Sequence, residues 1–211
     1  MLGQSGTSLG IAFPANPHVG DAIVATFFWY GPAGIVNSVT DRLADGTSVG
    51  NVYRLATSFT AGPVSMATYV ATNAQNFPDP NPDGTKRVVV EAHLSSSVPQ
   101  GGVIVSAYTG VQADPLQAVG AISSNSGSGT SATDAAPGPI TVAPGSLVYG
   151  VTVADAFVGL GRPPAPFAPV FQASDDSLPM KADAEAAVLA SGGAVEPRWN
   201  WGFSSGSPKT W

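Results

Sequence analysis

Three oxygen-bearing residues before a glycine give this 211-residue chain its most specific chemical pattern, that of a calcium loop. Asp79, Asn81 and Asp83 alternate ahead of Gly84, which places ligand oxygens at the first, third and fifth positions of such a loop. The bidentate acid expected at about the twelfth position is Val90 instead. A rigid turn rich in Pro, Asp and Gly accounts for the same residues. Calcium is therefore an alternative to a turn, and we expect no other cofactor.

A serine hydrolase is the second chemistry that the sequence suggests. Residues 202–206 read Gly-Phe-Ser-Ser-Gly, the G-x-S-x-G pattern of a nucleophile elbow. That elbow requires an acid and then a histidine later in the chain, but no Asp, Glu or His follows residue 206. The histidines, His18 and His93, show no triad spacing with Asp and Ser. We therefore expect no enzymatic activity.

Aromatic residues offer a binding surface rather than a reaction. The candidates for a ligand or subunit contact are Trp29, Tyr30, Trp199, Trp201 and Trp211. Trp199 and Trp201 are two residues apart and share one face of a predicted strand. Burial in a core is the favoured interpretation, because aromatic side chains dominate core packing. The alternative is an exposed platform for sugar rings or an apolar subunit interface.

Composition excludes several classes of partner. Charged residues make up 10% of the chain, against about 25% in typical soluble domains. The net charge of −6 disfavours binding to nucleic acid and to anionic membrane surfaces. No apolar run reaches the roughly 18 residues of a membrane span, so no membrane insertion is expected. The chain has no cysteine, and residues 1–6 lack the features of a signal peptide.

Alternating and continuous apolar runs, punctuated by Gly and Pro, predict strands throughout the chain. The expected strands are 8–13, 22–30, 36–40, 51–57, 64–72, 87–94, 102–108, 116–123, 140–142, 146–154, 170–173, 178–184 and 198–203. Residues 181–190 also have helix propensity, but we favour a strand with Met180, Ala182, Ala184 and Ala186 on one face. The prediction is all-β: a jelly-roll-like antiparallel β-sandwich with little or no helix. We expect a single domain, 1–211, with an exposed Gly/Ser/Thr-rich crossover at about 125–138.

Several short segments resemble jelly-roll β-sandwich modules of phage structural proteins and of bacterial secreted or surface proteins. The segments that carry the resemblance are 5–9, 19–24, 39–41, 51–55, 106–111, 114–116, 199–203 and 209–211. The resemblance implies a binding or assembly role, carries over no catalytic residue, and implies that the final strand continues past Trp211. An open edge there would be covered by another segment or subunit.

These observations together favour a non-enzymatic structural module displayed on a phage virion, as a capsid decoration or a tail or fibre component. Its expected partners are other virion proteins or copies of itself, and its expected location is the virion surface after assembly in the host cytoplasm. The alternative is an extracellular carbohydrate-binding or adhesion module on a bacterial cell surface, with cell-surface glycans as its ligands.

Overall fold

The computed structural model describes residues 2–129, 134–156, 158–159, 163–175, 180–201 and 209–211. It is 55% strand and 2% helix, and its sheets are antiparallel and open, as they are in β-sandwiches. The predicted all-β class is confirmed. Contacts group the chain into two compact units where we expected a single domain, and we describe each unit separately. The first unit consists mainly of 3–58 and 66–119, and the second mainly of 59–65 and 120–211.

The first unit is built on a six-stranded sheet with the order β1-β6-β2-β5-β4, in which β3 also pairs with β6. The strands are β1 (Leu2–Ala12), β2 (Ala22–Tyr30), β3 (Val36–Leu43), β4 (Arg54–Ala61), β5 (Val64–Ala71) and β6 (Val88–Tyr108). The order makes β4 an outermost strand, next to β5 alone. The strand β2 coincides with the predicted 22–30, because its apolar run is bounded by a glycine turn on each side.

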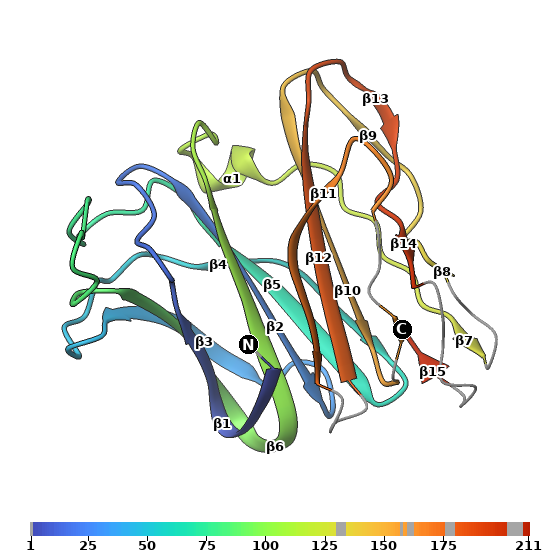
Figure 1. The fold of residues 1–211 in the computed structure, drawn as a ribbon, viewed down its shortest axis with the longest axis horizontal. Helices are drawn as coiled ribbons and strands as arrows, with labels where there is room; N and C mark the ends of the chain where they lie inside the picture. The colour runs from blue at the N-terminus through green and yellow to red at the C-terminus, as the bar shows by residue number, and fades with distance from the viewer. Residues whose placement is uncertain (1, 130–133, 157, 160–162, 176–179, 202–208) are drawn as a thin grey trace. The chain divides into compact units, whose positions relative to one another are not determined.

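The 21-residue strand β6 folds back on itself, as Figure 1 shows beside its label. Its first part pairs with β3, with Val88 opposite Leu43, and its second part pairs with β2, with Tyr108 opposite Ala22. The sequence predicted two separate strands here. Gly101, in the second part, lies opposite Trp29 of β2, and a Cβ added there would lie 2.7 Å from the Phe28 carbonyl oxygen. Only glycine allows that close approach.

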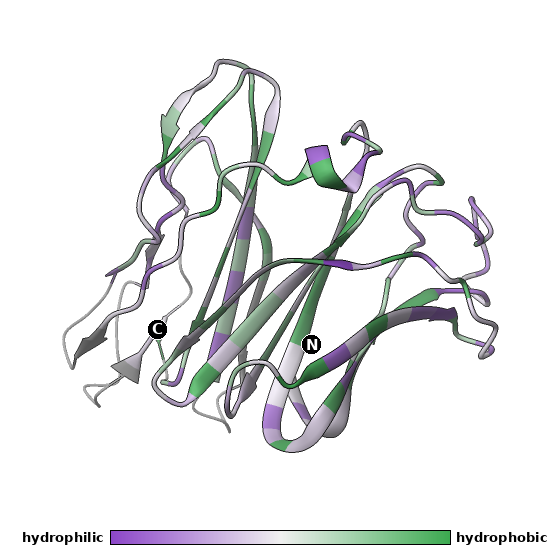
Figure 2. Cartoon of the chain, turned by 180° about the vertical axis from the view of Figure 1, so that it is seen from behind, coloured by the Kyte–Doolittle hydropathy of each residue, from purple (hydrophilic) through white to green (hydrophobic). Residues whose placement is uncertain are grey.

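Both parts of β6 contribute to one apolar cluster with β1, β2, β3 and β5. Four alternate residues of β2 point into it: Ile23, Ala25, Phe27 and Trp29. Phe27 meets Tyr69 edge to face, with ring centroids 6.1 Å apart. Figure 2 shows hydrophilic residues in the loops of this unit and also on its strands, where they interrupt the hydrophobic ones. Burial of this apolar area is the main term that holds the unit together.

A short helix, α1 (Pro115–Ala118), replaces the strand expected at 116–123. Asp114 caps it, because its carboxylate accepts from the Leu116 N–H at 2.9 Å. Pro115 occupies the first turn, where its missing N–H costs nothing. The prediction was wrong because a capping Asp followed by Pro outweighs a short apolar alternation. Among the described residues, no helix has the length and apolar character needed to cross a membrane.

The second unit contains a three-stranded sheet with the order β10-β12-β11 and three short two-stranded ladders, β13-β9, β14-β8 and β15-β7. The strands of the sheet are β10 (Ser146–Ala154), β11 (Ala168–Asp175) and β12 (Met180–Leu189). The ladder strands are β7 (Ser128–Gly129), β8 (Asp134–Ala135), β9 (Ile140–Val142), β13 (Gly193–Val195), β14 (Trp199–Asn200) and β15 (Lys209–Thr210). The predicted crossover thus contains two short paired segments. The segment with helix propensity is strand β12, as we favoured.

The centre of the first unit gives a test of this description. Replacing Phe27 by Ala removes a fully buried ring and its contact with Tyr69, and should lower the free energy of unfolding by about 3 to 5 kcal/mol. Replacing the exposed Val52 by Ala should change it by less than about 0.5 kcal/mol. Urea unfolding followed by tryptophan fluorescence measures both. Equal effects of the two changes would contradict the core assignment.

Candidate functional site

The strongest cluster of reactive side chains is a row of three ionisable residues on β12. Lys181, Asp183 and Glu185 are 2%, 1% and 0% exposed. Because alternate residues of a strand point to the same face, the three side chains lie in one line. Charged side chains are almost never this deeply buried unless they are paired. The row is therefore the first place in the described chain to look for chemistry.

The face that carries the row belongs to the interior of the second unit. Lys181 pairs with Ala154 of β10, and Glu185 pairs with Gly150. A Cβ added at Gly150 would lie 2.7 Å from Pro197 and 3.0 Å from the Trp199 ring, so the chain packs closely over this face. Two apolar clusters flank the row: Ala135, Ala154, Val158, Trp199 and Trp201 on one side, and Val148, Phe167 and Ala187 on the other. The row is thus a polar line inside an otherwise apolar core.

Lys181 is held between a carbonyl and a carboxylate. Its Nζ donates a hydrogen bond to the Gly159 carbonyl oxygen at 2.6 Å and lies 3.5 Å from Oδ2 of Asp183. Burial lowers the pKa of the Lys181 amine, and the Asp183 carboxylate partly opposes that shift. The amine is therefore easier to deprotonate than an exposed lysine.

Glu185 is the most deeply buried acid of the row. Its Oε1 accepts from the Arg198 backbone N–H at 2.9 Å, whereas Oε2 has no hydrogen-bond partner among the described residues. Burial raises the pKa of Glu185 to about 7, with a smaller contribution from the neighbouring charge of Asp183, although the hydrogen bond from Arg198 opposes the rise. Near neutral pH the carboxyl of Glu185 is thus available to give and to take a proton.

The other well-defined carboxylates serve to hold loops. Both oxygens of the buried Asp41 are occupied: Oδ1 accepts from the N–H groups of Gly50 and Asn51 at 2.9 and 3.1 Å. Its Oδ2 accepts from Asn51 Nδ2 at 2.7 Å and from the Tyr53 hydroxyl at 3.2 Å. Burial, followed by the charge of Asp41, raises the pKa of Tyr53. Asp41 directly follows the expected strand 36–40, and no local pattern signals this set of four donors.

The two acids predicted for calcium, Asp79 and Asp83, are directed to different partners, and the side-chain nitrogen of Asn81 has no hydrogen-bond partner among the described residues. Asp79 Oδ2 accepts from the Val19 N–H at 2.9 Å and lies 3.2 Å from His18 Nδ1. Asp83 Oδ1 accepts from both the N–H and the hydroxyl of Thr85. In the described part of the chain, no three His, Cys, Asp or Glu side chains come together as a metal site. The contacts of this segment are those of a turn, and calcium remains an untested alternative.

The aromatic candidates are mostly buried. Trp29, Trp199 and Trp201 are at most 2% exposed, so these three indoles cannot form a platform for sugar rings. They are core residues because each belongs to one of the apolar clusters. Tyr30 and Trp211 are intermediate in exposure. The structure does not bring the five candidates into one cluster, and the G-x-S-x-G pattern at 202–206 lies outside the described residues.

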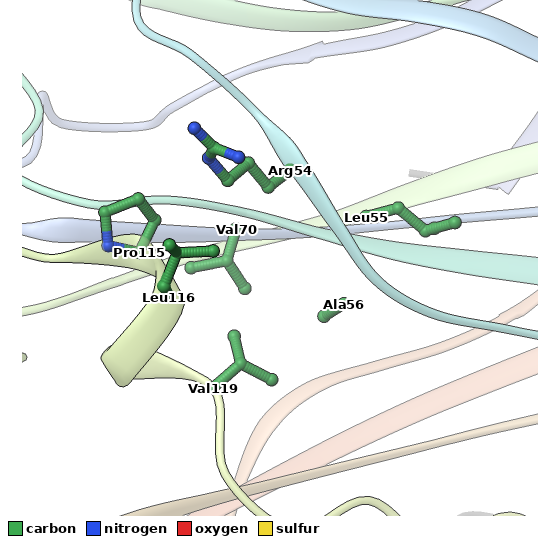
Figure 3. Close-up of a pocket in the computed structure, with 7 residues that line it drawn as sticks. All are labelled: Arg54, Leu55, Ala56, Val70, Pro115, Leu116 and Val119. Atoms are coloured by element: carbon green, nitrogen blue, oxygen red, sulfur yellow. The ribbon is translucent and has the colours of Figure 1, made fainter.

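A pocket of about 430 Å³ lies on the first unit, beside the outermost strand β4 (Figure 3). The residues that line it are Arg54, Leu55, Ala56, Val70, Pro115, Leu116 and Val119. Thr72 attaches the segment before α1 to the end of β5, since its hydroxyl donates to the Ala113 carbonyl at 2.7 Å. Leu55 and Leu116 both line this pocket and are 53% and 78% exposed. Sequence reasoning missed this pocket because it depends on the position of α1.

The chain has no match among protein-family models, and no curated protein or solved structure is significantly similar to it.

The raised pKa of Glu185 makes folding pH-dependent. The stability that this group contributes is fully present below its unfolded pKa of about 4.5 and is lost as the pH rises through about 7. Glu185→Gln removes the titration and keeps an acceptor for Arg198. Between pH 5 and pH 8 the wild type should lose roughly 2.5 kcal/mol more unfolding free energy than the variant. Urea unfolding of both proteins at the two pH values measures the difference, and parallel pH profiles would refute the assignment.

Removal of calcium should leave the chain unchanged, because Asp79 and Asp83 already have other partners. We expect the melting temperature in EDTA to agree with that in millimolar calcium within about 1 °C, since a ligand stabilises only a state that binds it. Differential scanning fluorimetry provides the measurement. If calcium raised the melting temperature and Asp83→Asn abolished that increase, the metal site would be established instead.

Proposed function

We propose that this chain is a non-enzymatic assembly module displayed on a phage virion, as a capsid decoration or a tail or fibre component. The observation that carries the proposal is the exposed apolar pocket beside β4. Large exposed apolar side chains that gather at one place mark contact surfaces more often than isolated ones do. Leu55 and Leu116 are both exposed and line the same pocket, to which a strand and a short helix contribute them.

The outermost position of β4 adds a second means of contact. Among the described strands, none pairs with the outer edge of β4. A strand edge presents unpaired N–H and C=O groups that can accept another strand, while a nearby pocket receives its side chains. A second copy of this chain offers the same edge in return, which is the geometry of a two-fold contact. We therefore infer that the module associates with itself through β4 and the pocket.

The charge distribution agrees with an assembly role. Only 10% of the residues are charged, and the cores of protein interfaces are depleted in charge. Arg54, at the rim of the pocket, has no ion pair within the described residues. A copy of this acidic chain can supply the carboxylate that Arg54 lacks.

Two other functions have less support. Catalysis on an external substrate would need accessible reactive groups, whereas Lys181, Asp183 and Glu185 are buried and Asp41 is bound by loop donors. A carbohydrate-binding or adhesion module would need exposed rings, whereas three of the four indoles are buried. Of the five aromatic candidates, Tyr30 and Trp211 are partly exposed and could contact a glycan.

Self-association through this surface gives a direct test. Light scattering coupled to size exclusion should show a mass that rises from monomer to oligomer with protein concentration. Leu116→Asp places a charge in the pocket and should weaken the association about tenfold or more.

Val188→Asp is the matched control, because Val188 is also an exposed aliphatic residue but does not line the pocket. It should leave the association unchanged. A wild-type chain that stays monomeric at its highest soluble concentration would overturn the proposal, and so would equal effects of the two substitutions. A change of tryptophan fluorescence on addition of glycans would favour the carbohydrate-binding alternative.

A further inference from the structure

The row on β12 is not needed for assembly, yet it brings together an amine and a carboxyl group inside the core. The Nζ of Lys181 lies 3.5 Å from Oδ2 of Asp183, and both side chains are at most 2% exposed. Because Oδ2 is bonded to Cγ of Asp183, the amine lies next to the carbon that it would attack. No external substrate can reach side chains this deeply buried, so the available reaction is between the members of the row.

We propose that Lys181 and Asp183 condense to an amide that joins their side chains within β12. The hydrogen bond from Nζ to the Gly159 carbonyl fixes the amine beside the carboxyl group. The same hydrogen bond can persist after the reaction, because the amide nitrogen keeps one hydrogen. The register of β12 with β10 holds both residues on one face of the sheet, with Ala154 opposite Lys181 and Thr152 opposite Asp183.

The reaction balances without any other reactant. Proton transfer within the ion pair first converts the ammonium and carboxylate into a neutral amine and a neutral acid. The Nζ lone pair then forms a bond to Cγ of Asp183, the bond from Cγ to its hydroxyl oxygen breaks, and one proton leaves Nζ. The hydroxyl and that proton depart as one water molecule. Nothing is oxidised or reduced.

Burial favours each step. A desolvated lysine is a better nucleophile because more of it is neutral, and burial does lower the pKa of Lys181. Keeping an ion pair in an apolar core carries a large desolvation penalty. The amide removes both charges and leaves a polar group that the Gly159 carbonyl can bind. The apolar clusters on either side of the row also keep out the water that would hydrolyse the product.

Glu185 supplies the proton carrier. It follows Asp183 on the same face of β12, is fully buried, and has one carboxyl oxygen without a hydrogen-bond partner among the described residues. In its protonated form it can give a proton to the leaving hydroxyl, and as a carboxylate it can take the proton that Nζ releases. A group of this kind accelerates a reaction about 10²- to 10⁴-fold.

The test is the mass of the purified full-length chain under denaturing conditions. The proposal expects a main species lighter than the sequence by one water molecule. Because the chain has no cysteine, no disulfide complicates the mass. Trypsin should not cleave after Lys181 in this species, so the fragment 182–198 should be missing. A chain of unmodified mass that releases this fragment in full would overturn the proposal.

Loss of water from Asp45 or Asp83, each followed by glycine, would change the mass equally through a succinimide ring. A succinimide leaves cleavage after Lys181 intact, so the tryptic digest distinguishes it from the amide. A light species that is still cleaved after Lys181 would count against the amide. Lys181→Met should abolish the loss, whereas Lys86→Met, at an exposed lysine, should retain it. Glu185→Gln should slow the appearance of the light species at least 100-fold. An unchanged rate in that variant would overturn the part assigned to Glu185.

Discussion

The first unit depends on a single strand that serves two neighbours. β6 pairs with β3 over its first part and with β2 over its second, so its bend fixes how these two strands face the same apolar cluster. In the second pairing the Phe28 carbonyl of β2 lies so close to Gly101 that no side chain fits there. Any substitution at this glycine therefore disturbs the pairing of β6 with β2. The position of β4 follows from the same arrangement, because β2 and β5 lie between it and β6.

The second unit is organised around a different constraint, which is the cost of buried charge. Its largest sheet places an amine and two carboxyl groups between apolar clusters. Such groups are tolerated only when they are paired, neutral or covalently joined. The carbonyl of Gly159 and the backbone N–H of Arg198 meet part of this requirement. The remaining cost can be lowered by loss of charge, which is why protonation and condensation are the reactions that this core favours.

The sequence predicted best where local patterns decide the structure. Strands 22–30 and 146–154 coincide with β2 and β10, because their apolar runs are long and bounded by turns. The bend of β6 could not be found in this way, because it depends on long-range pairing with two strands. The segment after Asp114 was assigned to a strand since its capping signal is only two residues long.

The site residues were harder to predict for a physical reason. Charged residues are expected at the surface of a protein. The alternation in β12 therefore indicated its apolar face but gave no sign that the face with the charged residues is buried as well. The aromatic alternation of Trp199 and Trp201 was compatible with a core or with a platform, and burial decides for the core. The pocket beside β4 combines residues about 60 positions apart, which no local pattern connects.

In the loop that follows β3, one carboxylate lowers the conformational entropy of an exposed part of the chain. Asp41 receives four hydrogen bonds from Gly50, Asn51 and Tyr53, so the backbone around Val52 is already ordered in the folded chain. Val52 itself is 70% exposed. Ordering a loop at the moment of contact weakens binding, because the lost freedom counts against the complex. Here that freedom is lost on folding, and a molecule that touches Val52 meets a surface that is already rigid.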